Sequence, residues 1–260
     1  VDSVTYTANS AYGDPNTVIP GGTGYVVYNG NSNTVTVTNL LPNSQYYFVV
    51  YEYNGSGIYT NYYTTGASGD RYTLATEPTV QAHNISFAPQ TPSLGNNTQL
   101  ILSWVRGNGD GCIVLAKAGA PIASAENPVD QANTNDYTAN AAFGAGDRIG
   151  DAYVVYSGTL NTVTVTGLLY GETYYFKVYE YNNGSGTNTA YATSTINYLT
   201  SDATGNPSYA IADSYESNDV MSKANYITSD GTLYTGIISN ASDVDWFSIE
   251  PDVAGGNNNL

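Results

Sequence analysis

The sequence has few of the residues on which enzyme sites commonly depend. Its 260 residues include one cysteine, one histidine, one methionine, and six lysines and arginines together. A single cysteine, Cys112, excludes an intramolecular disulfide. Its place in the apolar stretch GCIVLA indicates a buried strand residue rather than a reactive thiol. The only histidine, His83, lies near no nucleophile, zinc or phosphate-loop motif, so the sequence predicts no enzyme.

Positive charge is also scarce, and the formal net charge is −16. Nucleic-acid binding needs clustered lysine and arginine, so a nucleic-acid partner is not expected. No apolar run approaches the roughly 18 residues needed to span a bilayer, so membrane insertion is not expected either. No basic segment precedes an apolar run, which indicates a signal peptide already removed. The composition is typical of secreted, extracellular surface proteins.

Tyrosine, glycine and β-branched residues are abundant. With 26 tyrosines and 27 glycines and few strong helix formers, the composition predicts an all-β protein. The acidic excess is uneven, because residues 201–260 hold nine acidic side chains and one lysine. Such a segment can collect divalent cations or serve solubility alone.

An internal repeat organises the chain. Residues 25–54 align without gaps to residues 153–182, with twenty-one of thirty positions identical. Upstream, residues 6–13 match residues 137–144 at six of eight positions. The shared NTVTVT alternates with period two, which predicts a strand with one solvated face.

The strand YYFKVYEY alternates as well. Its predicted inward side chains are Tyr174, Phe176 and Val178, matched in the first copy by Tyr46, Phe48 and Val50. The outward set includes four tyrosines that could bind a ligand such as a surface polysaccharide. These are Tyr51, Tyr53, Tyr179 and Tyr181.

The stretch LLPNSQYYFVV, residues 40–50, resembles the corner of fibronectin type III domains. The resemblance implies that the hydroxyls of Tyr46 and Tyr174 reach back to the backbone. It places Trp104 as the core tryptophan of the second strand. The whole pattern is similar to tandem domains of large secreted bacterial surface proteins, and the expected fold is a series of Ig-like β-sandwiches.

Three segments follow from these patterns. Residues 1–76 are expected to form a partial fibronectin type III-like domain, and residues 77–205 a complete one. Fifty-eight residues precede Tyr137 in the second copy and five precede Tyr6 in the first, so three strands are expected to be absent from the first sandwich. Residues 206–260 resemble part of the bacterial pre-peptidase C-terminal domain, a small β-sandwich, through DSYESNDVMSKANYI and a DxDWF strand.

The second resemblance implies a calcium site, since some members of that family bind calcium through the acidic segment. Hard oxygen ligands suit calcium, which takes six to eight of them. The alternative is that these residues cap turns and flank a strand. The candidates are Asp213, Glu216, Asn218, Asp219, Asp243 and Asp245.

Two further sets of residues are candidate sites. Glu52 and Glu180, the two copies of YEY, raise the possibility of paired carboxylates, but equivalent positions in separate domains favour a structural role at the end of a strand. Glycosylation is expected at asparagine sequons if the host modifies them, and at a short O-glycosylation motif. These positions are Asn54, Asn84, Asn96, Asn183, Asn240 and Ser3.

Two classes of function fit this sequence. The first is a non-enzymatic structural or adhesive segment of an extracellular bacterial assembly, such as a filament subunit. Its incomplete sandwiches would be completed by strands from neighbouring subunits, which implies head-to-tail self-association. The alternative is an accessory region of a secreted hydrolase or peptidase that binds substrate or carbohydrate.

Overall fold

The computed structural model describes residues 2–89, 98–132, 136–169, 172–183, 195–201, 206–210, 221–227 and 244–249. Strands, turns and short 3-10 helices make up the described chain, so the predicted all-β fold class is confirmed. The chain divides into two compact units. Unit 1 comprises Val1–Glu77, Asp130–Asp136 and Asn182–Asn197, and unit 2 comprises Pro78–Val129, Tyr137–Tyr181 and Tyr198–Leu260.

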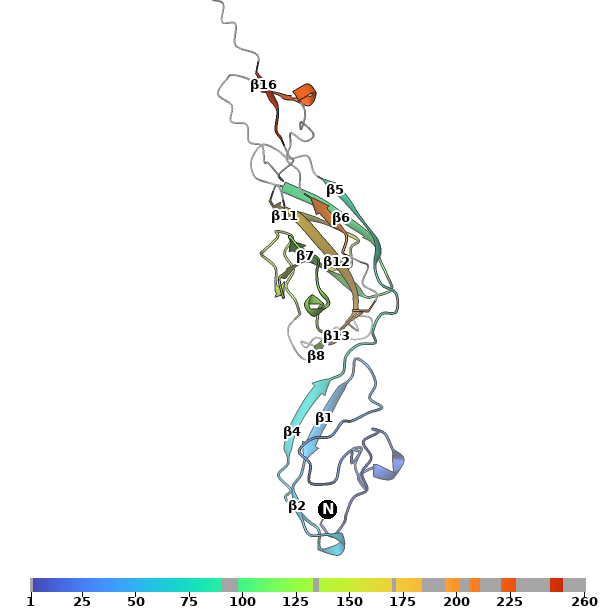
Figure 1. Cartoon of the computed structure of the whole chain (residues 1–260). Coiled ribbons are helices and arrows are strands. Elements are labelled where there is room, and N and C mark those ends of the chain that lie inside the picture. The colour runs from blue at the N-terminus through green and yellow to red at the C-terminus, as the bar shows by residue number, and fades with distance from the viewer. Residues whose placement is uncertain are drawn as a thin grey trace, which may run out of the picture. The chain divides into compact units, whose positions relative to one another are not determined.

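Unit 2 contains two antiparallel sheets built from the second copy of the repeat and the residues before it (Figure 1). One sheet has the order β11-β6-β5; in the other, β12, β7, β10 and β9 are neighbours in that order, and β14 pairs with β12. The strands are β5 (His83–Pro89), β6 (Thr98–Val105), β7 (Gly111–Ala118), β9 (Arg148–Ile149), β10 (Ala152–Gly158), β11 (Thr162–Leu168), β12 (Thr173–Asn182) and β14 (Ser208–Ala210).

The core of unit 2 forms from alternate side chains of these strands. Tyr174, Phe176 and Val178 are at most 1% exposed, which confirms the inward set predicted for the second copy. Trp104 and Cys112 belong to the same buried cluster, as expected. The ring of Trp104 packs against Tyr156 with centroids 5.6 Å apart.

Unit 1 has shorter ladders. Strand β1 (Gln45–Val50) pairs with β4 (Ala67–Tyr72), side by side in Figure 1, and β2 (Tyr53–Asn54) pairs with β3 (Asn61–Tyr62), both antiparallel. The short strand β8 (Gln131–Ala132) pairs with β13 (Thr195–Tyr198). The 3-10 helices η1 (Pro15–Thr17) and η2 (Gly57–Tyr59) lie in this unit, and η3 (Ser124–Glu126) lies in unit 2.

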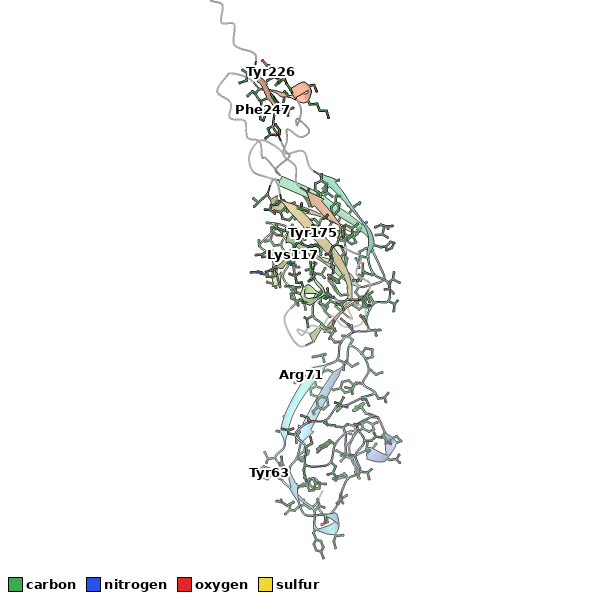
Figure 2. All side chains as sticks on the ribbon, viewed as in Figure 1. Tyr63, Arg71, Lys117, Tyr175, Tyr226 and Phe247 are labelled. Atoms are coloured by element: carbon green, nitrogen blue, oxygen red, sulfur yellow. The ribbon has the colours of Figure 1, made fainter. Side chains whose placement is uncertain are left out.

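Near the C-terminus, the structure describes a parallel pair of β15 (Asn225–Ile227) and β16 (Phe247–Ile249), preceded by η4 (Met221–Lys223). Phe247 and Tyr226 of this pair are labelled in Figure 2. The strand predicted at the DxDWF motif overlaps β16 only at Phe247, because β16 begins at the last residue of that motif. The three-segment division 1–76, 77–205 and 206–260 stays a prediction. In the described part of the chain, no helix is long and apolar enough to cross a membrane.

The two copies of the repeat keep the same local contacts. Tyr12 packs edge-on to Tyr46 with centroids 5.0 Å apart, and its counterpart Phe143 packs edge-on to Tyr174 at the same separation. Ala11 forms a parallel bridge with Thr38, as Ala142 does with Thr166. These equivalences allow unit 2 to serve as a template for unit 1, residue by residue.

Candidate functional site

The corner tyrosines of both copies make the hydrogen bond that the fibronectin resemblance implies. The backbone N–H of Leu41 donates to the Tyr46 hydroxyl, and that of Leu169 donates to Tyr174, both at 2.9 Å. Tyr174 is buried, whereas Tyr46 is half-buried. The corner therefore forms from local sequence alone, while its burial depends on the surrounding strands.

The hexapeptide NTVTVT takes two different structures. In unit 2 it supplies most of β11, which pairs with β6, and Val163 is 9% exposed. In unit 1 the identical residues 33–38 form no ladder, and Val35 is 43% exposed. Because the sequences are the same, the difference comes from the pairing strand β6, which among the described residues has a counterpart only in unit 2.

The same contrast holds at the neighbouring strands. In unit 2, β7 lies between β10 and β12 and pairs with both. The unit 1 counterpart of β12 is β1, which among the described residues pairs only with β4. The counterpart of β10, residues 24–30, makes one isolated bridge between Tyr25 and Val18. In unit 2, β6 and β7 pair with β11, β10 and β12. Within the described residues, the corresponding edges of unit 1 have no strand paired to them.

We call the free edge of β1, together with residues 34–37, the acceptor edge. Three of its valines are open to solvent: Val50, Val49 and Val35 are 63%, 50% and 43% exposed. The expectation that Val50 points into a core like Val178 is therefore wrong in unit 1, because no strand of the part that the structure describes covers this side chain. Exposed apolar side chains beside unpaired backbone favour the addition of a strand.

A buried ion pair fixes the turn before β7 in unit 2. Arg106 donates from Nε to Oε1 of Glu180 and from Nη2 to Oε2, both at 2.8 Å. The backbone N–H groups of Gly107 and Gly109 donate to the same carboxylate at 2.8 and 3.2 Å. The Glu180 side chain is fully buried, and its hydrogen bonds raise the pKa of Arg106 above its ordinary value. A carboxylate held by four hydrogen bonds in this way anchors the turn.

The unit 1 counterpart of Glu180 is Glu52, and its surroundings differ. Glu52 is exposed, and no described residue hydrogen-bonds or forms an ion pair with its carboxylate. Its backbone carbonyl accepts from the N–H of Tyr63 at 2.8 Å, matching the bond from Leu199 to Glu180 at 2.9 Å. The carbonyl contact is therefore equivalent in the two copies, whereas the arginine turn is found at Glu180 alone among the described residues. Sequence reasoning assigned both glutamates a structural role but did not identify Arg106 as the partner.

A second buried carboxylate, Glu126, is also structural. Lys117, labelled in Figure 2, donates from Nζ to both oxygens of Glu126 at 2.8 Å. Backbone N–H groups of Ala123 and Asp151 add two bonds of 2.8 Å. Burial alone would raise the pKa of Glu126, but these hydrogen bonds lower it from 4.5 to about 2. It is therefore ionised at neutral pH.

The four predicted ligand-binding tyrosines do not form one exposed face. Tyr51 is 48% exposed, and Tyr53 is half-buried with its hydroxyl donating to Asn29 at 2.6 Å. Tyr179 is fully buried and Tyr181 is 7% exposed, so their predicted outward exposure is wrong. The Tyr179 hydroxyl donates to Asn127 at 2.7 Å, and the Tyr181 ring packs against Tyr198 with centroids 5.5 Å apart. Other chain segments therefore cover the second face of β12.

Most of the predicted calcium ligands fall outside the described residues: Asp213, Glu216, Asn218, Asp219 and Asp243. Asp245 is described and lies half-buried just before β16. In the described ranges, no group of three or more histidine, cysteine, aspartate or glutamate side chains is placed to hold a metal. The calcium site stays a prediction.

The predicted glycosylation positions are likewise untested. Ser3, Asn54 and Asn84 are exposed, and Asn183 is half-buried. Ser3 and Asn84 have positive φ, 64° and 54°. Asn96 and Asn240 lie outside the described residues.

The single cysteine and the single histidine both lie in strands of unit 2. Burial raises the pKa of the Cys112 thiol to about 12, so it stays protonated at neutral pH. His83 is half-buried on β5, with Nδ1 3.4 Å from the carbonyl oxygen of Gln81.

Compared with known protein families, with curated proteins and with solved structures, the chain gives no significant match. The resemblances to fibronectin type III and pre-peptidase C-terminal domains therefore remain predictions from the quoted motifs.

Proposed function

We propose that this chain is a non-enzymatic structural segment of an extracellular assembly, in which unit 1 is completed by strands from a neighbouring polypeptide. One observation carries the proposal: in unit 2 NTVTVT pairs with β6 and both of its valines are buried, whereas in unit 1 residues 34–37 of the same hexapeptide lie in no ladder and Val35 is 43% exposed. The copy in unit 1 displays apolar side chains beside unpaired backbone groups. Such an edge is a template for the addition of a β-strand. Each such contact joins one polypeptide to the next, so the contacts propagate as a fibre.

The buried charged groups agree with a structural role. Glu180 and Glu126 are both saturated with hydrogen bonds from Arg106, Lys117 and backbone N–H groups. Such carboxylates hold turns in place, and they have no geometry for general acid or base catalysis. Secretion, filament formation and adhesion are parts of the same proposal.

Hydrogen exchange of the two identical hexapeptides tests the proposal with an internal control. In the isolated 260-residue chain, amides 34–37 should exchange much faster than amides 162–165, because only the latter lie in a ladder. In the native material from which the chain comes, both segments should be protected. Flanking residues distinguish the two peptides in a mass spectrum.

Two results would contradict the proposal. One is rapid exchange of residues 34–37 in the native material. The other is a thermally stable, monodisperse 260-residue monomer at all accessible concentrations. That monomer would favour the accessory-region alternative.

A further inference from the structure

The second copy of the repeat indicates which kind of strand the acceptor edge binds. We infer that its partner is a strand led by an arginine-glycine turn, and that Glu52 is the carboxylate that receives this arginine. This inference rests on the proposed function and names the chemistry of the partner. Residues 106–118 of this chain are built into unit 2, so the partner is another segment of the same chemistry, which the proposed function places in a neighbouring polypeptide.

The register of the partner follows from the pairing of β12 with β7. There Phe176 lies opposite Ala116, Val178 opposite Val114, and Glu180 opposite Cys112. Shifted to unit 1, the same register places small apolar residues opposite Phe48 and Val50. The partner strand therefore needs small side chains at every second position. The pattern CIVLA, residues 112–116, has them in Cys112, Val114 and Ala116.

The turn before the partner strand must carry a positive charge and must leave room for the carboxylate. In unit 2 the arginine fork closes on both oxygens of Glu180. A Cβ at Gly109 would lie only 2.8 Å from Oε2 of Glu180, so the turn needs glycine where it approaches the carboxylate. Glu52 is chemically identical to Glu180, lies at the same position of the repeat and is exposed. An Arg-Gly-x-Gly turn is thus complementary to it in both charge and shape.

The acceptor edge also favours this partner over an unrelated apolar strand. The whole chain carries a net charge of −16, so a partner that brings an arginine to Glu52 lowers repulsion at the joint. Desolvation of Glu52 by a strand without a cation would instead leave a buried, unpaired charge. Glu52 therefore determines which strand binds. The pairing of the strand with β1 supplies the buried contact area.

The test uses a labelled synthetic peptide of residues 106–118 with Cys112→Ser, titrated into the full 260-residue chain by fluorescence anisotropy. We expect saturable binding of one peptide per chain. Replacing Arg106 of the peptide by alanine should weaken binding at least about thirtyfold, as for loss of one partner of a buried charge pair. Glu52→Gln in the protein should cause a similar loss, and combining the two changes should cause little further loss.

Two controls make the result specific. Glu77→Gln changes another exposed glutamate of unit 1 and should leave peptide binding unchanged, and a scrambled peptide should not bind. No peptide binding, or equal binding to the Glu52→Gln protein, overturns the inference. If the native material still protects residues 34–37 from exchange in that case, the proposed function stands and only the partner chemistry is wrong.

Discussion

At the scale of single residues, Glu126 makes the stability of unit 2 depend on acid. Its pKa in the folded chain is about 2, against an ordinary value of 4.5, so folding favours the ionised form. The resulting stabilisation is fully present above about pH 4.5 and is lost as the pH falls from there towards 2. Glu126→Gln should lower the free energy of unfolding by about 2 kcal/mol at pH 7.

Denaturant unfolding between about pH 7 and pH 2.5 measures this effect. The curves of the native chain and the variant should converge as the pH falls. Glu77→Gln, at an exposed position, should run parallel to the native chain throughout. A Glu126→Gln curve that also stays parallel would show that the carboxylate does not stabilise the fold.

The residues of the candidate site differ in how far the sequence could predict them. Alternation correctly placed Tyr174, Phe176 and Val178 inside, and the corner motif predicted the Tyr46 and Tyr174 hydrogen bonds. The alternation could not predict the burial of Tyr179 and Tyr181. A period of two shows which side chains share a face of the strand, but it does not show whether other residues cover that face. The Arg106 partner was also missed, since residues 74 positions apart meet only through the tertiary fold.

At the scale of elements, the paired hexapeptides separate local preference from context. NTVTVT predicts a strand in both copies, yet only one copy forms a ladder, because a strand needs a neighbour to satisfy its backbone. Composition and periodicity therefore predicted the all-β class and the strands of unit 2. Neither indicates that residues 34–37 lack a ladder, since pairing is a long-range property; that expectation came from aligning the two copies, which left three strands absent from the first sandwich.

Matched valine substitutions turn this contrast into a measurement. Val165 is fully buried, and Val165→Ala should cost about 2 kcal/mol by loss of transfer energy and creation of a cavity. Val37, the same residue of the hexapeptide in unit 1, is half-buried, and Val37→Ala should cost less than about 0.5 kcal/mol in the isolated chain. Thermal unfolding of both variants gives the comparison. Equal costs would mean that unit 1 already has a complete core.

At the scale of the whole molecule, the net charge of −16 opposes association of identical chains. The screening length falls from about 30 Å at 0.01 M salt to about 10 Å at 0.1 M. We expect the assembled fraction to rise over this range, because repulsion between chains is screened more strongly than a buried ion pair. Sedimentation velocity at several salt concentrations measures the fraction. A fall with added salt would indicate that exposed opposite charges drive the association.

The exposed valines of the acceptor edge also make the strength of any association there depend on temperature. Covering Val35, Val49 and Val50 removes apolar surface from water, which lowers the heat capacity of the system. Apolar burial of this kind weakens on cooling. A fibre joined through such edges is therefore held together most firmly at warm temperatures, and it loosens in the cold without any change of sequence or solvent.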